Sequence, residues 1–184
     1  IPDTILAWKY FLDTLSKEKR DKCQLILHTT PIDEHGTDLP EVIRFLFPEE
    51  NHNVIISPGK FTTEQMSYLY NYADGTILLS SAEGWGLALT ESLLTGTPII
   101  ANVTGGMQDQ MRFEDKNGDW IEFNSDFPSN HRGTYKKHGE WALPVYPSNL
   151  SLVGSPKTPY IWDDRCNPED AAKQIKALYD MGDK

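Results

Sequence analysis

Residues 80–91 read S-S-A-E-G-W-G-L-A-L-T-E, and the rest of the chain can be arranged around this stretch. The run 76–79 before it is apolar and predicts a short buried strand. Gly84 and Gly86 then form a turn around Trp85, and a helix-like run follows as far as Gly96. A strand, a glycine turn and a helix start direct free backbone N–H groups and the positive end of a helix dipole at one point. Such a point suits a phosphate group.

Two carboxylates, Glu83 and Glu91, accompany this anion site. They indicate a ligand that carries both phosphate and hydroxyl groups, because carboxylates accept hydrogen bonds from sugar hydroxyls while amides hold the phosphate. Each acid also has a plainer interpretation. Glu83 could be a first-turn acid that complements the helix dipole, and Glu91 a solvent-facing helix residue. Their spacing alone leaves both interpretations open.

Strands and helices alternate through residues 1–112. The predicted elements are helix 3–16, strand 23–28, helix 39–46, strand 53–57, helix 62–73 with a capping box at Thr62, strand 76–81, the helix after Gly86, and strand 98–102. This alternation predicts an α/β fold, a Rossmann-like doubly wound parallel sheet. Ligands bind beyond the carboxyl ends of such strands, so we expect His28, Ser57, Lys60, the 81–87 turn and Gly105-Gly106 to line one crevice.

Residues 113–165 form an aromatic and Pro-rich insertion without a long periodic run. We expect it to be irregular and to pack on the sheet as an appended segment, because it is too apolar for a solvated tail. Residues 119–123 and 141–146 could be short strands or hairpin arms. A helix within 166–184 follows, with Asn167 as its N-cap and Pro168 at its first position. The chain is expected to be a single domain over residues 1–184.

The composition narrows the classes of function. A net charge of −10 argues against nucleic acid as the main partner. The sequence contains no run of eighteen apolar residues, so no transmembrane helix is expected. No leader sequence is visible at Ile1. The start without Met suggests a fragment. Cys23 and Cys166 form no CxxC pair, which favours a reduced, cytoplasmic location.

Glu83 and Glu91, separated by seven residues around Gly84-Trp85-Gly86-Leu87, resemble the Glu-x7-Glu signature of retaining glycosyltransferases of the GT-B fold, family 4 or group 1. The similarity continues through residues 94–100 and Gly105-Gly106. It covers roughly residues 1–112 and the last helix. Ser92 replaces the usual alanine after the second Glu, which is a change between small residues.

The resemblance implies roles for particular residues. Glu83, the catalytic candidate, would contact hydroxyls of the donor sugar, and Glu91 would bind the ribose hydroxyls. The remaining donor-binding candidates are Gly84, Trp85, Gly86 and Leu87 through their amides, Ser57 near the nucleobase, Lys60 near the phosphates, His28, Gly105 and Gly106. Lys60 could equally be a solvated loop lysine, and His28 a cap for the loop that follows it. Asp109 matches an acidic position that is common after the glycine pair.

The resemblance also implies an activity. The chain would be the C-terminal half of an enzyme that binds a nucleoside diphosphate sugar and transfers a hexosyl unit to an acceptor with retention. No metal or other cofactor would be required. An N-terminal acceptor domain and a basic Arg/Lys pair, expected upstream, would be missing, so the chain alone is expected to be inactive. Alternatives are another GT-B enzyme half, such as a sugar epimerase or a phosphorylase, and a non-catalytic α/β binding module.

Overall fold

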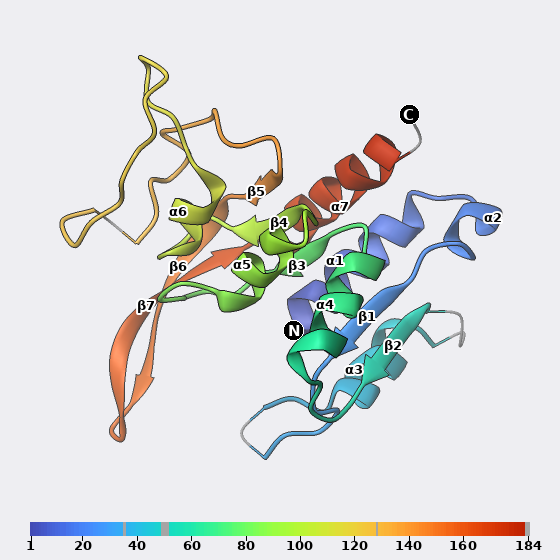
Figure 1. Cartoon of the computed structure of the whole chain (residues 1–184). Helices are drawn as coiled ribbons and strands as arrows, with labels where there is room; N and C mark the ends of the chain where they lie inside the picture. Colours follow the sequence, from blue (N-terminus) through green and yellow to red (C-terminus); the bar gives the residue numbers. More distant parts are fainter. Residues whose placement is uncertain (35, 49–51, 128, 183–184) are drawn as a thin grey trace.

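The structure, a computed structural model, describes residues 1–34, 36–48, 52–127 and 129–182 (Figure 1). Its parallel strands confirm the predicted α/β class. β1 (Leu25–His28) pairs with β2 (Val54–Ser57), and β4 (Ile99–Asn102) lies between β3 (Thr76–Leu78) and β5 (Ala142–Val145). β4 is buried along its whole length, as a central parallel strand covered on both faces should be.

The helices follow from local signals in the sequence. Their bounds are α1 Pro2–Asp13, α2 Lys17–Arg20, α3 Leu39–Leu46, α4 Thr63–Tyr72, α5 Leu87–Leu94, α6 Met107–Met111 and α7 Pro168–Gly182. The predicted capping box is confirmed, since the Thr62 side chain accepts from the Gln65 backbone and the Gln65 side chain accepts from the Thr62 backbone. The predicted C-terminal helix is confirmed as far as Gly182, and residues 183–184 lie outside the described part.

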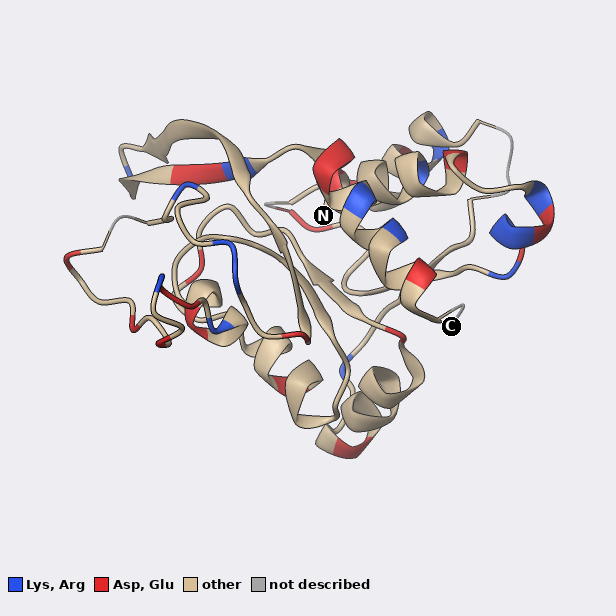
Figure 2. Ribbon diagram, turned by 90° about the horizontal axis from the view of Figure 1, so that it is seen from above, with Lys and Arg blue, Asp and Glu red and all other residues tan. Residues whose placement is uncertain are grey.

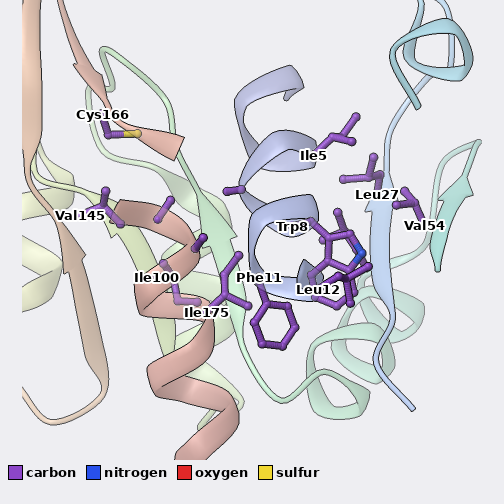
Figure 3. Close-up of a cluster of buried hydrophobic side chains, with 14 of the residues drawn as sticks. Ile5, Trp8, Phe11, Leu12, Leu27, Val54, Ile100, Val145, Cys166 and Ile175 are labelled. Atoms are coloured by element: carbon purple, nitrogen blue, oxygen red, sulfur yellow. The ribbon is translucent and has the colours of Figure 1, made fainter. Parts of the chain in front are cut away.

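One continuous sheet was expected over residues 23–102, and this expectation is wrong in one respect. The strands form two hydrogen-bonded sheets, β1-β2 and β3-β4-β5. A shared apolar core joins them instead. Figure 3 shows α1 with Trp8 and Leu12 directed at Leu27 and Val54, while α7 and the strands with Ile100 and Val145 lie on the other side. The two sheets are therefore held together through α1 and α7, whose buried side chains belong to the same cluster.

A second cluster of buried apolar side chains lies beneath α5 and α6 and supports the turn between β3 and α5. Its members are Leu89, Ile99, Ala101, Val103, Met107, Met111, Phe113 and Ala142. Leu89 and Met107 are fully buried. Burying side chains of this size stabilises a fold by roughly 1.5–3 kcal/mol each, so the helices on either side of the turn are firmly anchored.

The segment 113–165 is more regular than predicted. Residues 142–145 form β5, which extends the parallel sheet beside β4. β6 (Pro147–Ser155) and β7 (Thr158–Cys166) form an antiparallel hairpin that projects away from the body of the protein (Figure 1). Residues 119–123 form no strand; only an isolated bridge joins Glu114 and Trp120.

The hairpin escaped prediction because most of its side chains stay in solvent, so neither strand shows a strong apolar alternation. The aromatic residues of the segment divide into two groups. Phe123 and Tyr135 pack near Phe113, whereas Tyr160 and Trp162 of the hairpin remain 65% and 57% exposed.

The charged residues are unevenly distributed over the elements of the structure. α4 and α5 carry acidic residues but no Lys or Arg, and the basic residues are clustered most densely at α2 (Figure 2). No helix within the described ranges is long and apolar enough to cross a membrane.

Candidate functional site

The predicted site centres on the turn that joins β3 to α5. Gly86 is the N-cap of α5 and has a φ of +83°, a left-handed conformation that glycine adopts without strain. Glu83 is half-buried, and Trp85 is 44% exposed. Among the described residues, no protein acceptor is found for the backbone N–H groups of residues 84–88. These N–H groups, at the start of α5, form the kind of surface that holds an anion.

The carbonyl groups of the turn are directed at protein donors. The Glu83 carbonyl accepts from the Gly106 N–H at 3.2 Å. The buried side chain of Gln110 donates to the carbonyls of Trp85 and Gly86, the latter at 3.3 Å. Because the C=O and N–H of a trans peptide point in opposite directions, these bonds leave the N–H side of the turn open.

The glycine pair at 105–106 packs directly against the Glu83 turn, and its expected contact with a ligand stays a prediction. A Cβ on Gly105 would lie 2.0 Å from the Glu83 carbonyl oxygen, and one on Gly106 would lie 2.2 Å from the Gly84 carbonyl oxygen. The Gly105 N–H donates to the Ser129 carbonyl at 2.8 Å, and the Gly106 N–H donates to Glu83. Both amides are thus engaged within the protein. The two glycines let the loop after β4 press against the Glu83 turn and fix its position.

Glu91 lies two turns into α5 and has a defined partner on α4. The hydroxyl of Tyr70 donates to its carboxylate at 2.9 Å. Burial of the Tyr70 ring, with the bond to Glu91 and its negative charge, raises the pKa of Tyr70 well above its usual value, so this hydroxyl stays protonated and remains a donor. Glu91 itself is exposed. Tyr70 therefore orients a carboxylate whose other oxygen is open to solvent.

A second group of predicted residues meets at the ends of β1 and β2. His28 and Ser57 are register partners, and His28 Nδ1 lies 3.3 Å from Ser57 Oγ. The His28 ring stacks on Phe61 with centroids 4.2 Å apart. Phe61 was not predicted, and its place four residues after the end of β2 gave no signal. Lys60 is exposed beside it.

The structure thus brings the candidates together in two groups rather than one. Glu83, the residues 84–87 and the pair Gly105-Gly106 are in direct contact. Within the described chain, no hydrogen bond or ring contact connects this group to His28, Ser57 and Phe61. That both groups line a common crevice stays a prediction.

Sequence reasoning missed a buried carboxylate at the same edge of the sheet. Asp164 of β7 is fully buried and accepts from Thr104 Oγ1 at 2.7 Å and from Asn130 Nδ2 at 2.6 Å. Its N–H donates to the Ser81 carbonyl at 2.8 Å, and its carbonyl accepts from Asn102 Nδ2. Asp164 therefore ties the base of the hairpin to the strand ends that lead into the turn and into the glycine pair.

Next to this network lies an aromatic cluster that was also missed. The His131 ring is 4% exposed and contacts Phe113 edge to face, with centroids 4.4 Å apart. Burial lowers the pKa of His131 to about 4, so the ring is neutral near pH 7. A cavity of about 240 Å³ opens beside it, lined by Phe127, Asn130, His131, Arg132, Thr134 and Tyr135. In the described part of the chain, no group of three or more His, Cys, Asp or Glu side chains is arranged to hold a metal ion.

Together, the parallel sheet and the strand–turn–helix unit at its edge define a Rossmann-like domain with a candidate anion site. Residues 46–127 match the family model described as glycosyl transferases group 1. The matched range contains the turn, Glu83, Glu91 and the glycine pair, whereas His28 and Asp164 lie outside it. The match confirms the resemblance found in the sequence. No curated protein matches the chain.

Proposed function

We propose that this domain binds the nucleoside diphosphate sugar donor of a retaining hexosyltransferase. The observation that carries the proposal is the row of backbone N–H groups at residues 84–88, which runs from the turn after Glu83 into the first turn of α5. The described residues provide no acceptor for these groups. A diphosphate supplies the acceptors that these N–H groups lack, and the α5 dipole favours its negative charge.

The two carboxylates divide the ligand between them. Glu91, held by Tyr70, accepts from the ribose hydroxyls, and Glu83 accepts from hydroxyls of the hexose. When the bond between the hexose and the diphosphate breaks, negative charge grows on the leaving phosphate. Amides that already point at that phosphate stabilise the charge without reorganising. The transfer would retain the anomeric configuration and require no metal ion.

Two further points belong to the proposal. In the enzymes that this domain resembles, a second Rossmann-like domain binds the acceptor, so we propose that transfer requires such a domain as well. We also propose that the protein works in the cytoplasm, where thiols such as those of Cys23 and Cys166 remain reduced.

NMR titration of the ¹⁵N-labelled chain tests the proposal. UDP, GDP and ADP are added separately, because the base is not specified by the site. The amide signals of residues 84–88 are expected to shift with saturable, weak binding, with further shifts at residues 57–60 if both groups of candidates face one ligand. Binding that shifts only signals in residues 113–165, or no binding by any of the three nucleotides, would contradict the proposal.

A further inference from the structure

Gln110 of α6 belongs to a closed ring of hydrogen bonds with the turn. The indole N–H of Trp85 donates to Thr90 Oγ1 at 2.7 Å, and the Thr90 hydroxyl donates to Gln110 Oε1 at 2.8 Å. Gln110 Nε2 in turn donates to the backbone carbonyls of Trp85 and Gly86. The ring begins and ends on Trp85.

The direction of every bond in this ring is determined by chemistry. An indole N–H can only donate, so Thr90 Oγ1 must accept from Trp85. The backbone carbonyls of Trp85 and Gly86 can only accept, so the Gln110 amide is oriented with Nε2 toward them. This places Gln110 Oε1 toward Thr90, where it accepts from the Thr90 hydroxyl. Through Thr90, the Trp85 side chain is thus connected to the glutamine that holds the Trp85 backbone.

We propose that Gln110 is a positioning residue that aims the N–H groups of Gly86 and Leu87 at the diphosphate. Its bond to the Trp85 carbonyl sets the peptide plane that carries the Gly86 N–H, and its bond to the Gly86 carbonyl sets the plane that carries the Leu87 N–H. Gly86 has no side chain to restrict its own rotation, so an external constraint on these planes is needed. Gln110 is 7% exposed and supplies that constraint from inside the protein. This inference rests on the proposed donor site.

The same short helix offers a matched control. Gln108 is 2% exposed and also donates to backbone carbonyls, those of Gly105 and Ser129. Its Oε1 accepts from the His131 N–H. Gln108 therefore loses comparable hydrogen bonds when it is replaced, but none of them involves the peptides of Trp85 or Gly86.

The test compares Gln110→Met with Gln108→Met, two neutral substitutions of similar volume. Affinity for UDP, GDP and ADP is measured by calorimetry at a temperature where both variants are folded. We expect Gln110→Met to weaken the affinity of whichever nucleotide binds by about tenfold, because misdirected N–H groups make poorer bonds to phosphate, and Gln108→Met to change it less than twofold. Thr90→Val, which breaks the ring but leaves Gln110 in place, should produce an intermediate loss.

A second readout needs no ligand. In the free protein, Gln110→Met should move the amide NMR signals of Gly86 and Leu87 more than Gln108→Met does, while signals of α1 and α7 stay in place. Equal nucleotide losses in the two variants, or unchanged Gly86 and Leu87 signals in Gln110→Met, would overturn the inference. If the wild-type chain binds none of the three nucleotides, the proposed function fails, and the signals of the free protein still decide whether Gln110 positions the turn.

Discussion

At the scale of single residues, the candidate site depends on glycines that allow the loop after β4 to lie close to the backbone of the Glu83 turn. Gly105 has a φ of +50°, and a Cβ there would lie 2.0 Å from the Glu83 carbonyl oxygen. The contact places the loop after β4 directly against the residue that would contact the donor sugar. Gly105 therefore contributes to the position of Glu83 although its own N–H is engaged elsewhere.

Gly105→Ala is expected to lower the free energy of unfolding by roughly 2–4 kcal/mol, because it adds a steric clash to an unfavourable φ. Gly96→Ala is the matched control. Gly96 has a φ of +79° with nothing within 4 Å of its would-be Cβ, so its replacement should cost only about 1 kcal/mol. Urea unfolding measures both values. Equal costs would mean that the contact with Glu83 contributes nothing.

At the scale of elements, the first 112 residues could be predicted from the sequence because their signals are local. The capping box at Thr62 marked α4, and buried apolar runs marked β1, β2 and β4. The break between the two sheets could not be predicted, because it depends on how α1 and α7 pack between distant strands. The hairpin could not be predicted either, since its exposed strands lack a buried face.

The hairpin is joined to the site by Asp164, and this link can be tested. Asp164→Ala leaves the donors of Thr104 and Asn130 without their buried acceptor, so we expect a loss of roughly 2–4 kcal/mol in the free energy of unfolding. Asp163→Ala, one residue earlier on β7, removes only an ion pair with the half-exposed Arg165 and should cost less than about 1 kcal/mol. Thermal or urea unfolding provides the comparison. Similar losses for both variants would show that the buried network does not hold the hairpin.

At the scale of the whole molecule, some residues of the candidate site could be predicted from the sequence and others could not. Glu83, Glu91 and the glycine turn share one stretch of twelve residues, and its resemblance to a glycosyltransferase signature made them candidates. Tyr70, Gln110 and Asp164 come from three other elements and meet this stretch only after folding. No spacing rule connects them to it, because each contact depends on tertiary packing. The sequence therefore indicates the candidate ligand-facing groups, whereas the structure adds the groups that hold them.

The central claim, that the domain binds a nucleoside diphosphate through the turn and Glu91, is tested most directly by the affinities of two glutamate variants. Glu91→Gln keeps the shape of the side chain but loses a charged acceptor, which is worth about 1.5–3 kcal/mol in a hydrogen bond. Glu64→Gln is the matched control, because Glu64 of α4 also accepts from a tyrosine hydroxyl, that of Tyr68 at 2.8 Å, and is exposed.

The affinities of wild type and both variants are measured by calorimetric titration. The ligand is the nucleoside diphosphate with the highest affinity for the wild-type chain. We predict an affinity for Glu91→Gln that is about ten- to a hundredfold weaker than that of wild type, and an affinity for Glu64→Gln within twofold of wild type. Equal affinities for wild type and Glu91→Gln, or equal losses in both variants, would contradict the assignment of Glu91 to the ribose hydroxyls.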